Sequence, residues 1–148
     1  MSRILFCVVP ERGHVNPCIG PALALKHGGH AVAFHAPGDI RPQLARAGGF
    51  ACFGPIESPR PADWRRGAGF ARQVRDPAWL RAWVTSLLLD GVEAEVARIR
   101  ESIHAWHPDV VVIDPLLYAA AIAAGAEGLP WVAMSNSLNP VLPASLES

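Results

Sequence analysis

The sequence predicts an α/β protein with a five-stranded parallel sheet of order 3-2-1-4-5 and helices on both faces. Short apolar runs alternate with stretches of helix-forming residues, and the connections between most of them are short. The runs are apolar throughout, as expected for strands buried on both faces. Right-handed crossovers then favour a doubly wound sheet, in which ligands bind at the carboxyl ends of the strands.

The first strand and helix flank a short loop. Residues 4–9 are an apolar run, and residues 19–27 are rich in helix formers. Between them, Gly13 permits a turn or a close approach to a ligand. Asn16 is the expected helix cap, and Pro17 suits the first turn, where a missing N–H costs nothing.

The next elements repeat this rhythm until a long loop interrupts it. We expect a strand over 31–36, a short helix over 40–47 and a third strand over 50–53. Residues 54–77 hold four prolines and five arginines, with a poorly formed helix near 68–74. They fit a solvated loop or a variable rim over a substrate cleft, and the sequence leaves both interpretations open.

A single long helix is predicted over 77–107, with a bend permitted at Gly91. Its tryptophans recur with other apolar residues at helical spacing, so we interpret them mainly as core, with a cleft-lining role as the alternative. The residues expected on its wet face are Glu93, Glu95, Arg98, Arg100 and Glu101.

The predicted fold ends with a strand, a helix and a strand. These cover residues 109–114, 117–126 and 131–134, and residues 138–148 show no clear element.

Composition narrows the class of protein. A chain of 148 residues suits one domain, and its 13 basic and 13 acidic residues cancel, which argues against nucleic acid or an anionic membrane as partner. It has no apolar run long enough for a membrane span and no signal peptide pattern, so we expect a cytoplasmic protein. The three cysteines lack C-x-x-C spacing, which favours reduced thiols and no metal site.

Two polar residues follow strands that are neighbours in the predicted sheet. His14 comes after the first strand and Asp114 closes the fourth, so both should lie at the same edge. A carboxylate beside an imidazole fixes its tautomer and stabilises the imidazolium, which suits a general base. The alternative is that His14 only decorates a loop and Asp114 caps the next helix.

Other candidates lie at the same edge. Gly13 and Asn16 flank the first histidine, and His35 is placed near the carboxyl end of the second strand, where it could face a cleft. Ser135 and Ser137 follow the fifth strand, where they could also serve only as turn residues.

The Gly-His-Val-Asn-Pro segment at 13–17 and the Pro-Asp-Val-Val-Val-Ile run at 108–113 resemble the N-terminal, acceptor-side domain of GT-B glycosyltransferases of family 1, the macrolide and plant secondary-metabolite type. The resemblance implies a Rossmann-like fold and inverting transfer of a sugar from a nucleotide-sugar. The acceptor would be a hydroxyl of a hydrophobic small molecule, such as a polyketide, macrolide, flavonoid or terpenoid. It implies that His14 is the base, that Asp114 orients it, and that Ser135 and Ser137 lie near donor sugar or acceptor.

The resemblance also implies a second, donor-binding domain that has no counterpart in the sequence. We therefore expect residues 1–148 to be a partial acceptor-binding domain that pairs with a C-terminal domain in cis or in trans. The nucleotide-sugar would be a co-substrate held mainly by that domain, with no cofactor and no metal. The isolated chain should be inactive.

A second hypothesis is a non-catalytic small-molecule-binding or assembly module that pairs with a separate donor-binding half, or a homo-oligomer formed through exposed surface. The sequence lacks the G-x-G-x-x-G dinucleotide fingerprint, the P-loop and the G-x-S-x-G elbow of hydrolases.

Overall fold

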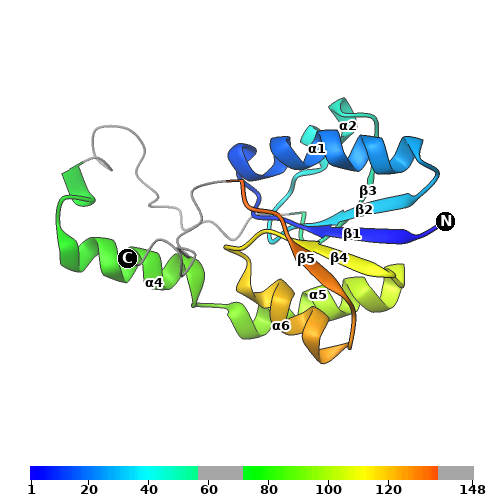
Figure 1. The fold of residues 1–148 in the computed structure, drawn as a ribbon. Coiled ribbons are helices and arrows are strands. Elements are labelled where there is room, and N and C mark those ends of the chain that lie inside the picture. Colours follow the sequence, from blue (N-terminus) through cyan, green and yellow to red (C-terminus); the bar gives the residue numbers. More distant parts are fainter. Residues whose placement is uncertain (57–71, 137–148) are drawn as a thin grey trace, which may run out of the picture.

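The fold is the predicted α/β sheet, seen in a computed structural model that describes residues 1–56 and 72–136 (Figure 1). All strand pairs are parallel, and the order is β3-β2-β1-β4-β5. The strands are β1 Arg3–Cys7, β2 Ala31–His35, β3 Ala51–Phe53, β4 Val110–Ile113 and β5 Trp131–Ala133. The helices are α1 Arg12–His27, α2 Arg41–Arg46, α4 Pro77–Leu88, α5 Val92–Trp106 and α6 Tyr118–Ala126.

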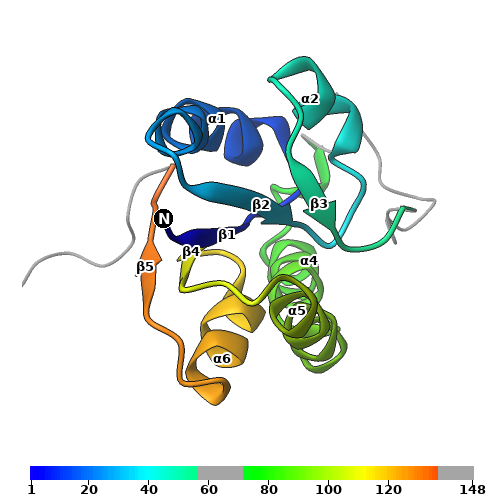
Figure 2. The same cartoon turned by 90° about the vertical axis from the view of Figure 1, so that its right-hand side faces the viewer.

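Helices cover both faces of the sheet and divide the core into two layers. Figure 2 shows α1 and α2 on one face and α5 and α6 on the other. Leu5 and Cys7 of β1 face the α5–α6 layer, whereas Ile4 and Phe6 face the α1–α2 layer. These side chains are buried, which explains why the strand is apolar from Ile4 to Cys7.

Helix α1 begins earlier than the sequence predicts. The Glu11 carbonyl accepts the N–H groups of His14 and Val15, both at 2.9 Å, so the helix starts at Arg12. Asn16 is therefore an exposed helical residue and not the cap, and Pro17 lies inside the helix. Burial of Val15 against the sheet favours the extra turn over the local preference of proline.

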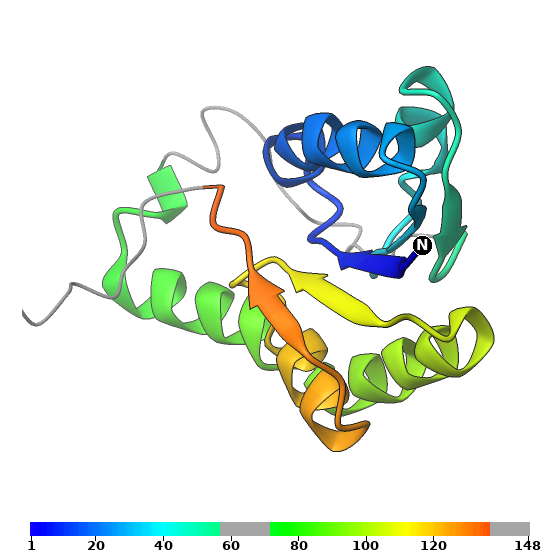
Figure 3. The ribbon, with the colours of Figure 1, turned by 45° about the vertical axis from the view of Figure 1, so that its right-hand side comes forward.

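The predicted single helix over 77–107 is wrong, because the chain forms two helices. Gly91 adopts a left-handed conformation with φ of 84° and caps α5, which a continuous helix cannot accommodate. Helix α4 extends beyond the carboxyl ends of the strands (Figures 1 and 3).

The tryptophans of α4 are not core residues. No described residue of this helix is buried, and the half-buried rings of Trp79 and Trp83 stack with centroids 6.0 Å apart. The expected helix over 68–74 lies largely outside the described residues.

Strand β5 forms one edge of the sheet (Figure 3). Trp131 is 48% exposed and Val132 is 53% exposed, so this edge presents apolar surface. None of the helices in the described ranges is both long and apolar enough to cross a membrane.

Candidate active site

The sheet brings His14 and Asp114 together from positions 100 residues apart. β1 and β4 are parallel neighbours in which Cys7 pairs with Ile113, and the Asp114 N–H continues the ladder to the Cys7 carbonyl at 2.9 Å. His14 lies in the first turn of α1, directly beyond the end of β1. The two residues therefore meet at the carboxyl edge, as the sequence predicts.

A short hydrogen bond joins their side chains. His14 Nδ1 lies 2.6 Å from Asp114 Oδ2, and the other carboxylate oxygen accepts the Leu116 N–H at 3.0 Å. The Asp114 side chain is 2% exposed, whereas that of His14 is 20% exposed. A carboxylate is only an acceptor, so Nδ1 carries the hydrogen and Nε2 keeps its lone pair. This arrangement can remove a proton from a bound hydroxyl.

The backbone of His14 is held from a third strand. Asn136, just after β5, places its amide nitrogen 3.2 Å from the His14 carbonyl oxygen and 3.8 Å from Cys18 Sγ. The Cys18 thiol donates to the same carbonyl at 3.3 Å. The serines on both sides of Asn136 were predicted as candidates, whereas Asn136 itself was not.

His35 lies in the interior and does not face an open cleft. Its ring is fully buried, with Nε2 2.7 Å from Glu95 Oε1 and Nδ1 2.8 Å from Ser102 Oγ. Glu95 also accepts a hydrogen bond from Arg98 at 2.8 Å. The prediction that Glu95 lies on the wet face is wrong, since it is 7% exposed. Its spacing of four residues from buried Ile99 was the signal for this.

The surroundings of Glu95 and of two cysteines shift the pKa values of these groups in opposite directions. Burial acts to raise the pKa of Glu95, but hydrogen bonds and positive charge from His35 and Arg98 outweigh it and hold that pKa below its usual range. Burial, and secondarily the Glu95 charge, raises the pKa of the Cys7 thiol. Burial also raises the pKa of Cys18, against the hydrogen bond from Asn136. These thiols are therefore protonated at neutral pH and unsuited to nucleophilic chemistry.

The remaining candidates predicted from the sequence are exposed or lie outside the described residues. Gly13 is exposed in the first turn of α1, with open space where a Cβ would lie and no positive φ. Asn16 and Ser135 are exposed, and Ser137 lies outside the described residues. Of the predicted candidates, the structure thus joins His14 and Asp114 through a side-chain hydrogen bond.

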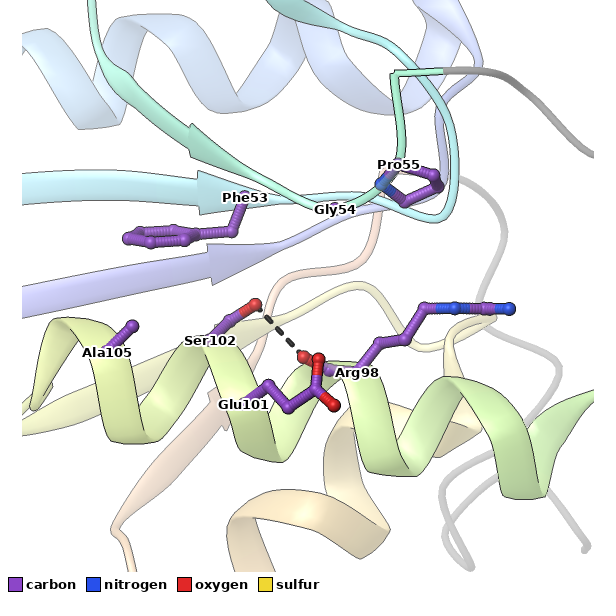
Figure 4. Close-up of a pocket in the computed structure, with 7 residues that line it drawn as sticks. All are labelled: Phe53, Gly54, Pro55, Arg98, Glu101, Ser102 and Ala105. Atoms are coloured by element: carbon purple, nitrogen blue, oxygen red, sulfur yellow. Dashed lines mark hydrogen bonds between the residues drawn. The ribbon is translucent and has the colours of Figure 1, made fainter.

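A shallow hollow lies between the end of β3 and α5 (Figure 4). Its volume is about 450 Å³, and it is lined by residues 53–55 and by Arg98, Glu101, Ser102 and Ala105. The close-up shows the Ser102 hydroxyl donating to the Arg98 carbonyl. Within the described ranges, no three His, Cys, Asp or Glu side chains gather as a metal site would require.

Known proteins similar to this chain are transferases of sugars. The chain is 26% identical over 143 residues to the L-demethylnoviosyl transferase of Streptomyces niveus, covering 93% of this chain and 35% of that protein. It is 28% identical over 139 residues to the demethyllactenocin mycarosyltransferase of Streptomyces fradiae, covering 93% and 30%. The chain therefore spans about a third of the length of these curated relatives. No family model matches it.

Solved glycosyltransferases share the fold. The match to SnogD of Streptomyces nogalater has a TM-score of 0.64 and 26% identity, and covers 93% of this chain and 34% of that one. VinC, solved in complex with DTDP, matches with a TM-score of 0.61 and 24% identity over 93% and 35% of the two chains. The structure of SpnG complexed with spinosyn aglycone matches with a TM-score of 0.62 and 22% identity. The match covers 97% of this chain and 36% of that one. The fold is that of one part of GT-B glycosyltransferases of family 1, consistent with their N-terminal domain.

Proposed function

We propose that this chain, similar in sequence and fold to glycosyltransferases of natural-product biosynthesis, is the acceptor-binding part of an inverting, metal-independent glycosyltransferase. The acceptor is a hydroxyl of a hydrophobic small molecule such as a polyketide or macrolide, and His14 is the general base. The observation that carries the proposal is the 2.6 Å bond between His14 Nδ1 and buried Asp114, which leaves Nε2 as the basic atom on a partly exposed ring.

The chemistry follows from that tautomer. Nε2 takes the proton of the acceptor hydroxyl while the oxygen attacks the anomeric carbon from the side opposite the nucleoside diphosphate. A new C–O bond forms, the bond to the diphosphate breaks with its electron pair on the leaving oxygen, and the configuration inverts. Asp114 stabilises the imidazolium through Nδ1, and its second oxygen is fixed by the Leu116 N–H.

The donor would be held mainly by a second domain. A helix N-terminus there can bind a diphosphate without a metal, which fits the proposal of no metal and no cofactor. Two structural neighbours were solved with a nucleoside diphosphate and with an aglycone, in keeping with these substrate classes. The free cysteines Cys7, Cys18 and Cys52 suit a reducing compartment, and we propose the cytoplasm.

A second candidate function is a non-catalytic small-molecule-binding or assembly module. The observation that favours it is the apolar edge at β5, where Trp131 is 48% exposed and Val132 is 53% exposed. Such a module would pair with a separate donor-binding half or with a second copy through exposed apolar surface such as Trp131 and Val132. Light scattering of the purified chain, alone and mixed with a donor half, distinguishes these assemblies.

The test of the enzymatic proposal is a chimera in which this chain replaces the matching third of one of its relatives. His14→Ala should lower turnover about 10²–10⁴-fold, the usual range for loss of a general base. Asp114→Ala should lower it somewhat less, because the imidazole remains. His27→Ala, at the far end of α1, is the control and should keep full turnover. Near-normal turnover by the His14 variant with an ordinary alcohol acceptor would refute the role of base.

A further inference from the structure

The first turn of α1 lacks one of its regular backbone hydrogen bonds. The helix contains Pro17 and Pro21, and proline has no N–H. The Gly13 carbonyl therefore lacks the donor that residue 17 would supply in a regular helix. His14 lies in this turn, and two side chains bond its backbone: Cys18 from within α1 and Asn136 from outside the helix.

Those contacts converge on the His14 carbonyl oxygen. It receives the Cys18 thiol at 3.3 Å and the Asn136 side-chain amide at 3.2 Å. The orientation of the Asn136 amide is fixed by chemistry, because its oxygen against a carbonyl oxygen would be repulsive and only the NH₂ group can donate. Its nitrogen also lies 3.8 Å from Cys18 Sγ, so one amide contacts two residues of the helix.

Asn136 itself is anchored to the sheet. The N–H of Met134, two residues before it, donates to the Ile113 carbonyl at 2.9 Å and extends the pairing of β5 with β4. Asp114 follows Ile113 directly. The backbone of His14 and the ring of His14 are thus held by residues that follow two adjacent strands.

From this geometry we propose that Asn136 is a positioning residue, which holds the His14 carbonyl so that the ring keeps its hydrogen bond to Asp114. The proposal rests on the proposed function for its catalytic consequence, while its structural part stands on the contacts alone. Loss of the amide donor loosens the first turn of α1 and weakens the Nδ1–H bond to Asp114 Oδ2. Asn136 touches no reacting atom in this scheme.

The experiment is nuclear magnetic resonance of this chain, observing the His14 Nδ1–H proton that bonds Asp114. In Asn136→Ala, its exchange with water should become about threefold to tenfold faster, the effect of losing one hydrogen bond. Asn136→Asp has nearly the same shape but no donor toward a carbonyl, so it should exchange at least as fast. His27→Ala, at the far end of α1, is the control and should leave the rate unchanged.

The outcomes separate this proposal from the function. Backbone amide spectra identify any variant that has not folded, and Asn136→Gln, which keeps the donor, should then restore slower exchange than Asn136→Ala. Unchanged exchange in folded Asn136→Ala, or normal exchange in Asn136→Asp, overturns the proposal even if His14→Ala abolishes turnover. Accelerated exchange supports it even if His14 proves not to be the base. In an active chimera, Asn136→Ala should lower kcat about threefold to tenfold and leave the KM for the acceptor unchanged.

Discussion

Two histidine–carboxylate pairs lie at the same edge of this sheet, and they differ mainly in access to solvent. His14 bonds Asp114 at 2.6 Å and His35 bonds Glu95 at 2.7 Å, so the ion-pair geometry is nearly the same. The His14 ring is 20% exposed, and no hydrogen bond to its Nε2 occurs among the described residues. The His35 ring is completely buried, with both nitrogens bonded.

The difference teaches that a carboxylate neighbour alone does not make a catalytic base. Around His35, the Ser102 hydroxyl donates to the Arg98 carbonyl, so its oxygen accepts from Nδ1 while Glu95 accepts from Nε2. Both ring nitrogens then carry hydrogens and neither can take another proton. We infer that this second pair anchors α5 to β2, whereas the first keeps a lone pair for chemistry.

The largest predicted effect is a difference in unfolding free energy between variants of the two histidines. His35→Ala leaves the buried Glu95 carboxylate without its hydrogen bond from His35, which should cost about 3–5 kcal/mol of unfolding free energy. His14→Ala admits water to Asp114, so it should cost only about 1 kcal/mol. Urea denaturation of both variants measures the contrast. Equal losses would remove the distinction between an anchor and a base.

A double substitution sharpens the same contrast. Replacing His35 and Glu95 together by leucine removes both buried charges. The loss of stability in this double variant should be about 1–3 kcal/mol smaller than the sum of the losses in the two single variants. The denaturation midpoints of the two single variants and the double variant give this coupling energy. Simple additivity would mean that the two side chains do not act as a pair.

The smallest predicted effect is on acid stability. The pKa of Glu95 is held below its usual range, so the stability from its ionised form is present at neutral pH and is lost as pH falls through that lowered pKa. At pH 6 the Glu95→Gln variant should therefore be less stable than the unsubstituted chain. Between pH 6 and pH 3 its stability should fall by a smaller amount. Thermal unfolding across that range checks it.

Glu127 is the matched control for the acid experiment. Hydrogen bonds from His104 and Arg100 also lower its pKa, but on the surface of the chain. Glu127→Gln should change the loss of stability between pH 6 and pH 3 less than Glu95→Gln does. A larger change at the surface site would contradict the assignment of Glu95 as the buried anchor.

The sequence predicts the sheet because its strands are short apolar runs and its connections are mostly short. The meeting of His14 with Asp114 follows from strand order alone, since residues after adjacent parallel strands share an edge. Local signals fail where packing or a single dihedral angle decides. Pro17 suggests a later start for α1, but burial of Val15 favours the earlier one, and Gly91 ends a helix that apolar spacing alone would continue.

The buried pair was harder to predict for a physical reason. Glu95 carries a charge, which ordinarily marks an exposed face, and its partner His35 lies 60 residues earlier in another element. Only the three-dimensional pairing offsets the cost of burying it. Asn136 was missed because its role is a contact to a backbone carbonyl, which leaves no pattern in sequence.

The central claim, that His14 offers a free lone pair and His35 does not, is tested most directly by nitrogen-15 resonances of the two rings in this chain. The neutral His14 ring should carry its hydrogen on Nδ1 and have no hydrogen on Nε2, whereas His35 should carry a hydrogen on each ring nitrogen. A neutral His14 ring with its hydrogen on Nε2, or a His35 ring with a nitrogen that carries no hydrogen, would contradict the account.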